Sequence, residues 1–182
     1  KPYQQSRSFA KIYLDRYLQE GRPQRGPHGA IEGIVATSAF LAIGESRAQG
    51  LVTPETLDAL KHALSRMSTE GHYPNWLRCD WPPYEVDHHF GVTLMLIAIG
   101  TTPGAFTEQP EIASGIARLR TWLEKNPPQN AHHIGMVLWA DATGGIELSE
   151  ETRAQYIKFC RSLQQDDGGW SVYGIGKWKR PD

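Results

Sequence analysis

The stretch SLQQDDGGWSVYG, residues 162–174, decides the fold that the sequence predicts. It follows an amphipathic helical pattern and places two glycines directly before a tryptophan. Glycines end helices, and Asp-Gly favours a turn. A large aromatic side chain after such a turn needs a surface to pack against. We therefore expect Gly168 and Gly169 to stop the helix and Trp170 to pack back between neighbouring helices, as a joint in a repeating architecture.

The composition indicates one domain or a large part of one. The chain has 182 residues, with 19 Lys and Arg against 20 Asp and Glu. This balance gives no net field to attract nucleic acid or an anionic membrane. No apolar run is long enough for a membrane span, and no signal peptide is visible. We expect a soluble domain with no nucleic-acid partner and, because it begins at Lys1, a processed or truncated N terminus.

Apolar periodicity predicts an all-α protein of about seven helices. Four helices carry one apolar stripe and are expected to face water on the other side. Three segments are apolar or small on nearly every side, which is typical of helices covered by protein. The stripes are Ile12, Tyr13, Tyr17, Leu18; Leu57, Leu60, Leu64, Met67; Ile112, Ile116, Leu119, Leu123; and Tyr156, Phe159, Cys160, Leu163, and the covered segments are residues 29–44, 90–100 and 134–145.

This alternation of helix types predicts an α/α toroid, in which an outer ring of helices wraps an inner ring. The expected hairpins span about 5–49, 53–101 and 108–144, followed by a last outer helix at 149–165. Thr53 and Pro54 are expected to open the second outer helix, as N-cap and first helical residue.

An internal repeat supports the toroid. HHFGVTLMLIAIG begins at His88, and HHIGMVLWADATG begins 44 residues later at His132. Both copies read His-His-x-Gly, and a second glycine follows nine residues after the first. Forty-four residues is a natural length for one hairpin of two helices.

The joint residues resemble the QW motif of squalene–hopene cyclases and of the related prenyltransferase/squalene-oxidase repeats. Phe159, Gln164, Gly168 and Trp170 form a good copy of the motif, and residues 70–76 form a degenerate copy that keeps Trp76. The chain is also similar to planctomycete-type squalene-cyclase-like proteins, through residues 80–100, 117–140 and 162–171. The resemblance implies an α/α toroid over most of residues 29–178.

The resemblance also implies an incomplete ring. Seven helices make three and a half hairpins, whereas a closed toroid of this family needs about six. We expect a fragment, or a ring completed by another polypeptide or a missing segment. The apolar face of the 149–165 helix would then be partly bare.

One segment lies where the cyclases carry their acidic DxDD motif. In YEVDHH, residues 84–89, Asp87 matches the proton-donating aspartate, Glu85 stands for the first aspartate, and His88 replaces the last. Protonating an alkene requires a neutral carboxylic acid, whose pKa burial and neighbouring carboxylates raise. An adjacent histidine instead favours the ionised form. The alternative is that Asp87 caps its helix.

Two histidine pairs open the inner helices and suggest a metal site. A toroid would bring His88, His89, His132 and His133 to one rim, beside Asp87 and Glu85. Two histidines and a carboxylate could bind zinc or iron. The alternative is that these rings bond loop carbonyls and fill space. Cys79 does not match the zinc motif of the prenyltransferases, and with Cys160 it is expected to be a free thiol.

Aromatic side chains could line a pocket for a hydrophobic or isoprenoid ligand and stabilise a carbocation. The candidate lining residues are Trp81, Tyr84, Phe90, Trp139 and His132, with Trp122 and Trp178 as further aromatics, although core packing explains most aromatics in such a fold. Asp141, inside an apolar helix, is expected to be a structural anchor or, alternatively, a second carboxylate in the lumen.

The expected function is therefore that of a binding or scaffold module, rather than a cyclase, completed by a further chain or segment. The first alternative is a terpenoid cyclase or prenyl-transfer enzyme with Asp87 as general acid. The second is a domain of a metal- or haem-containing protein whose cofactor is carried elsewhere. The residues indicate no cofactor other than that possible zinc or iron ion.

Overall fold

The computed structural model describes every residue except 1, 21–26, 75, 77–86, 173 and 176–182. Eight helices occur in this part of the chain, and its only β-pairing is an isolated bridge between Gln164 and Trp170. The all-α prediction is confirmed. The helices are α1 (Pro2–Glu20), α2 (Pro27–Gln49), α3 (Pro54–Ser65), α4 (His88–Gly100), α5 (Gly104–Thr107), α6 (Pro110–Lys125), α7 (Ala131–Ala142) and α8 (Glu150–Ser162).

The seven expected helices are all present, and the short α5 is an addition. This helix is a single turn that follows Pro103 and buries only Phe106. One turn is too short to produce a helical period in the sequence. It connects α4 to α6, against which it packs.

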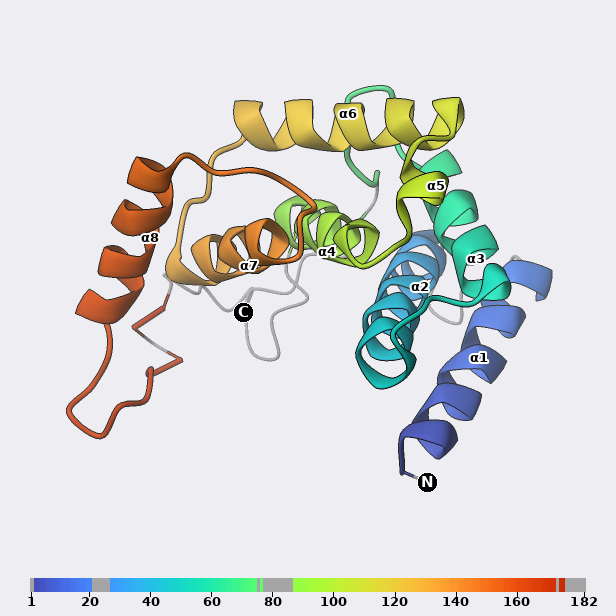
Figure 1. Ribbon diagram of the computed structural model, residues 1–182, viewed down its shortest axis with the longest axis horizontal. Coiled ribbons are helices and arrows are strands. Elements are labelled where there is room, and N and C mark those ends of the chain that lie inside the picture. Colours follow the sequence, from blue (N-terminus) through green and yellow to red (C-terminus); the bar gives the residue numbers. More distant parts are fainter. Residues whose placement is uncertain (1, 21–26, 75, 77–86, 173, 176–182) are drawn as a thin grey trace.

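The helices form an arch of two layers (Figure 1). Helices α2, α4 and α7 lie on the inside of the arch, and α1, α3, α6 and α8 lie along its outside. Helix α4 packs against α2, α6 and α7, while α2 also contacts α1 and α3, and α7 also contacts α8. The described helices therefore alternate between an outer and an inner layer along the chain.

The core is centred on α4, which is covered on every side as expected. Ten of its 13 residues are buried, including Leu94, Met95, Leu96 and Ile97 at 0 % exposure. Helix α6 covers it with the predicted stripe of Ile112, Ile116, Leu119 and Leu123, all of which are buried. The predicted stripe of α3 is also buried, except for the half-buried Leu57.

The predicted apolar stripe of α1 is wrong. Ile12 is 57 % exposed, and Tyr13 and Leu18 are exposed as well; the side chain of Tyr17 lies outside the described residues. Leu14 is buried instead and packs with Leu41 and Ala59. Helix α1 contacts α2 along the line of Tyr3, Arg7, Ala10 and Leu14, and the small Ala10 permits the close approach.

Full coverage of α2 and α7 was also predicted, and this is wrong in part. Phe40 on α2 is 53 % exposed, and Gly135 and Ala142 on α7 are exposed. The reason is position, because α4 has an inner neighbour on both sides, whereas α2 and α7 are the end helices of the described inner layer.

The joint after α8 differs from the prediction. Helix α8 ends at Ser162, before the glycines, and Gly168 serves the following turn with a φ of 86°. The side-chain amide of Gln164 donates to the Gly168 carbonyl at 2.6 Å, and Trp170 Nε1 donates to the Cys160 carbonyl at 2.7 Å. The Trp170 ring is thus held against the last turn of the preceding helix, α8, and is 49 % exposed.

The Trp76 joint, by contrast, packs as expected. Trp76 is buried, and its ring lies against the backbone of Gly91 on α4. A Cβ at Gly91 would come within 2.7 Å of that ring, whereas nothing lies within 4 Å of a Cβ at Gly135, its repeat equivalent. Packing therefore requires the glycine of the first His-His-x-Gly copy but not that of the second.

This difference predicts opposite effects of the same substitution. Gly91→Ala should lower the free energy of unfolding by roughly 1 to 3 kcal/mol, because Trp76 must shift in a packed core. Gly135→Ala should raise it by about 0.5 to 1 kcal/mol, because alanine has a higher helix propensity than glycine and has room at this exposed position. Urea unfolding of the two variants checks this. Equal destabilisation by both would contradict the different surroundings.

A buried carboxylate joins the first three helices. Glu45 on α2 is fully buried and accepts a hydrogen bond from Arg7 Nε of α1 at 2.7 Å. It also accepts from the Thr53 backbone N–H at 2.8 Å and from the Thr53 hydroxyl at 2.9 Å. Thr53 precedes α3 as predicted, but its side chain makes no cap bond and donates to Glu45 instead.

These bonds outweigh the effect of burial on Glu45. Burial alone would raise its pKa, but the hydrogen bonds from Thr53, Arg7 and Thr56 hold the pKa of this carboxyl below its usual range. The carboxylate is therefore the form that the fold stabilises.

Removing this carboxylate should cost more than removing an exposed one. Glu45→Ala leaves the Thr53 N–H unpaired and should lower the free energy of unfolding by roughly 2 to 3 kcal/mol. The matched control is Glu55→Ala, in the exposed first turn of α3, which should have a clearly smaller effect. Chemical denaturation measures both, and similar losses would show that Glu45 does not join the helices.

Candidate functional site

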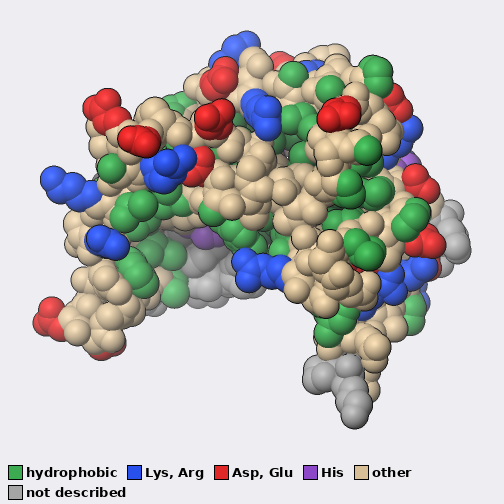
Figure 2. Space-filling view, viewed as in Figure 1, with side chains coloured by type: hydrophobic (Ala, Val, Ile, Leu, Met, Phe, Trp, Pro, Cys, Tyr) green, Lys and Arg blue, Asp and Glu red, His purple; other side chains and the backbone are tan. Residues whose placement is uncertain are grey.

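A pocket lies where α4 and α7 begin and α6 ends. Its volume is about 510 Å³, which is within the ~300–1,000 Å³ of typical ligand pockets. A histidine side chain is visible deep in the recess below the arch (Figure 2). The pocket is lined by Asp87, His88, His89, Trp122, Lys125, Asn126, Pro127, Gln129 and His133.

Asp87 links the two inner helices at this pocket. It is the N-cap of α4, where its Oδ1 accepts from the Phe90 N–H at 3.1 Å. Its Oδ2 lies 3.0 Å from Nε2 of His133 on α7. Burial alone would raise the pKa of Asp87, but the hydrogen bonds from His133 and Phe90 outweigh it and lower the pKa to about 2. Asp87 is therefore a carboxylate at neutral pH.

The bonds of His133 assign its tautomer. Its Nδ1 accepts from the Gln129 backbone N–H at 3.3 Å, so this nitrogen carries no proton. The proton is then on Nε2, which donates to Asp87. The Asn130 side chain caps α7 by accepting from the His133 N–H at 2.9 Å, which holds the start of the helix in place. Both ring nitrogens of His133 are thus used in hydrogen bonds to the protein.

His89 lies parallel to His133, with ring centroids 4.0 Å apart and an interplanar angle of 6°. It is buried, and neither ring nitrogen has a hydrogen-bond partner among the described residues. Burial is the main reason that the pKa of His89 is lowered, to about 3. The ring is therefore neutral, and it lines the pocket beside Trp122 of α6.

The other two histidines of the repeat make their closest ring contacts outside this stack. His132 stacks on Phe90, with ring centroids 5.9 Å apart, and burial lowers its pKa. His88 meets the edge of His72, with ring centroids 4.5 Å apart. His72 was not predicted as part of the site, because it stands alone in the sequence and comes from the loop after α3.

The histidines were also predicted to hold a metal. Among the described residues, no three His, Cys, Asp or Glu side chains are placed to bind a metal ion. The chemistry of the described rings agrees, since His133 uses both nitrogens in protein bonds and His132 packs on Phe90. The metal site stays a prediction that these contacts do not support.

The structure describes only some of the residues that the sequence analysis considered for the site. Glu85, Trp81, Tyr84, Cys79 and Trp178 lie outside the described residues. Phe90 and Trp139 pack against the core and do not line this pocket, nor does His132. Lys125, Asn126 and Gln129 do line it and were missed, because nothing in the sequence brings the end of α6 to the start of α4.

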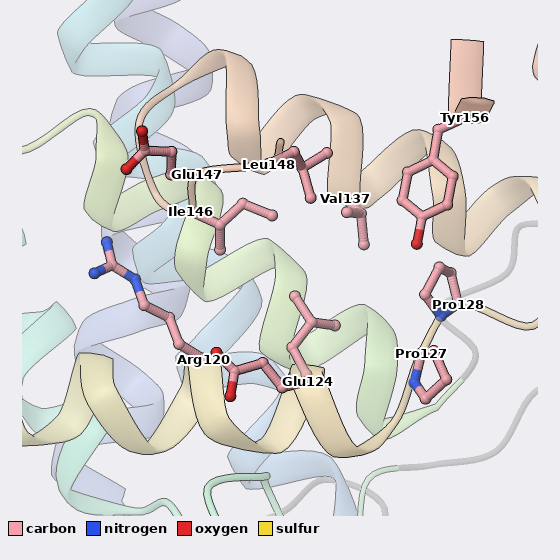
Figure 3. Close-up of a pocket in the computed structure, with 10 residues that line it drawn as sticks. Arg120, Glu124, Pro127, Pro128, Val137, Ile146, Glu147, Leu148 and Tyr156 are labelled. Atoms are coloured by element: carbon pink, nitrogen blue, oxygen red, sulfur yellow. The ribbon is translucent and has the colours of Figure 1, made fainter. Parts of the chain in front are cut away.

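A smaller pocket lies between α6, α7 and α8 (Figure 3). Its volume is about 250 Å³, which is below the usual range for drug-sized ligands. Leu123, Val137, Ile146 and Leu148 form apolar walls, and Tyr156 of α8 points across it toward Pro127 and Pro128. The space suits one ring-sized group, so the pocket at Asp87 is the better candidate for a larger ligand.

Asp141 is the structural anchor that was expected. It accepts from Arg153 Nε at 2.6 Å and from the Leu148 N–H at 2.8 Å. The hydrogen bond from Arg153 is the main reason that the pKa of Asp141 is lowered, although burial opposes it. The carboxylate thus joins α7 to the start of α8.

No family model, curated protein or solved structure matches this chain. Within the part of the chain that the structure describes, no helix combines the length and the apolar character that crossing a membrane would need.

The low pKa of Asp87 predicts a pH-dependent stability. A pKa of about 2 in the folded state, against ~3.9 unfolded, stabilises the fold by about 2 kcal/mol above pH 4. This contribution is lost as the pH falls from about 4 to 2. Asp87→Asn removes it, so wild type and variant should differ at pH 7 and converge near pH 2. Denaturant unfolding across this range measures it, and a constant difference would contradict the shift.

Proposed function

We propose that the chain is a squalene-cyclase-like α/α-toroid domain that acts as a binding or scaffold module. The alternation of outer and inner helices along the arch supports the toroid, and the exposed ends of the inner layer support completion by a further chain or segment. The pocket at Asp87 is the proposed binding site, and a hydrophobic or isoprenoid compound is the proposed ligand.

The observation that carries this proposal is the state of Asp87. A cyclase acid has to be neutral to protonate an alkene. Two hydrogen bonds instead stabilise the ionised form of Asp87. One of its oxygens caps α4, and the other binds His133 of α7. A carboxylate that joins two helices is not available as a proton donor, which favours a binding module over an enzyme.

The walls of the pocket are compatible with an apolar ligand. Trp122 contributes an aromatic face, and the rings of His89 and His133 are stacked and largely buried. The neutral His89 ring presents a flat surface of low charge, while Lys125 at the end of α6 supplies a cation. An isoprenoid with an anionic head group, such as a prenyl diphosphate, would find both features.

A terpenoid cyclase or prenyl-transfer enzyme is the alternative function. The observation in its favour is that Asp87 lines a pocket of suitable size at the start of an inner helix. For this role, ligand binding would have to displace His133 from Asp87, so that burial could raise the pKa of the carboxyl.

The two functions differ in product. On incubation with squalene or a prenyl diphosphate, we expect quenching of tryptophan fluorescence but no cyclised or transferred product by mass spectrometry. Trp122→Phe should weaken binding, whereas Trp139→Phe, a matched change away from the pocket, should not. Product that disappears in Asp87→Asn would establish the enzyme instead. No binding of either compound would overturn the proposed ligand.

A further inference from the structure

Helix α8 buries fewer of its residues than α3, α4, α6 or α7, the other long helices in which the burial of every residue is described. None of its 13 residues is buried, whereas the 12-residue α3 buries five. In the arch it lies at one end, with α7 on one side (Figure 1). Hydrophobic side chains are visible on the surface in this region (Figure 2). An isolated helix of ~12–15 residues is marginal in water, so α8 gains from a partner.

The side-chain and backbone contacts that the structure describes between α8 and the rest of the chain lie on one side of the helix. Arg153 bonds Asp141, Tyr156 lines the small pocket, and the Cys160 carbonyl accepts from Trp170. These residues follow helical spacing, and they hold α8 by polar bonds and partial packing. Apart from the Glu150 charge, which acts on Arg153, the flank next to them takes no part in these contacts.

That flank carries a regular stripe of four exposed residues, Glu150, Ala154, Ile157 and Arg161. They are spaced by four, three and four positions, which is the spacing of a helix-packing seam. Ile157 is 37 % exposed, and Ala154 is small enough for another helix to approach closely. One end of the stripe is acidic and the other is basic.

The stripe is complementary to itself when reversed. Its centre falls midway between Ala154 and Ile157, and Glu150 and Arg161 lie equally far from it. A second helix of the same sequence, packed antiparallel, would place Glu150 against Arg161 at both ends and Ala154 against Ile157 in the middle. A parallel pair would place Glu150 against Glu150. Charge complementarity therefore selects one orientation.

We propose that two copies of this chain associate through α8, packed antiparallel about a two-fold axis at the centre of this stripe. Two-fold symmetry repeats every contact of such an interface, so the Glu150–Arg161 pair forms at both ends. The inference rests on the proposal that this end of the arch takes a further chain, and it identifies that chain as a second copy.

The test uses charge reversal in two separate variants, Glu150→Arg and Arg161→Glu. Either variant alone places like charges against each other at both ends, so its dimer should dissociate at roughly tenfold higher concentration than the wild type. An equimolar mixture restores both opposite-charge pairs in the heterodimer and should associate as tightly as the wild type. Sedimentation velocity over a dilution series measures all three samples.

The matched control is Gln155→Arg, compared with Ala154→Arg. Both sites are exposed neighbours, but residue 155 is turned about 100° away from residue 154 on the helix. Only Ala154→Arg should abolish the dimer, and circular dichroism should show the same helix content in both variants.

Several results would overturn the inference. These are a wild type that stays monomeric at every concentration, a dimer unaffected by Ala154→Arg, or a mixture that associates no better than its components. A monomeric wild type would mean that the α8 flank binds another protein or segment instead of a second copy. It would not affect the ligand assay, so failure of this inference can be told apart from failure of the proposed function.

Discussion

The structure depends on one constraint, which is that α4 has no polar side. Its buried residues occur around the whole helix, from His89 to Ile99. Burial of apolar area is favourable at about 25 cal/mol per Å², so the stable arrangement surrounds this helix completely. Helices α2, α6 and α7 provide that cover. The arch follows, because covering one central helix forces its neighbours onto both of its flanks and its outer face.

Three carboxylates then join the helices at their ends. Glu45 connects α1, α2 and α3, Asp87 connects α4 and α7, and Asp141 connects α7 and α8. Each accepts a hydrogen bond from a backbone N–H at or near the start of a helix and another from a basic side chain or a histidine. Charge-assisted bonds of this kind are stronger than neutral ones. The same bonds keep all three groups ionised, which suits architecture and opposes proton donation.

Helix types were largely predictable from the sequence, and the site was not. The stripe of α6 and the apolar run of α4 are properties of spacing, and both were buried as predicted. The predicted stripe of α1 was wrong because the helix packs on α2 through the small Ala10 and through Leu14, so its larger apolar residues face outward. Asp87 was open to both an acid and a cap role. The hydrogen bond from the Phe90 N–H shows the cap role, and the bond from His133, 46 positions away, favours the ionised carboxylate over the acid.

The sequence by itself determined the all-helical class, the helix boundaries to within a few residues, and the alternation of one-sided and fully apolar helices. These properties are local, because they follow from side-chain period and capping residues along one segment. Only the tertiary structure decided which histidine meets Asp87, which glycine lies under Trp76, and which flank of α8 is open. Those contacts join distant segments, and their geometry depends on how the helices are arranged in space.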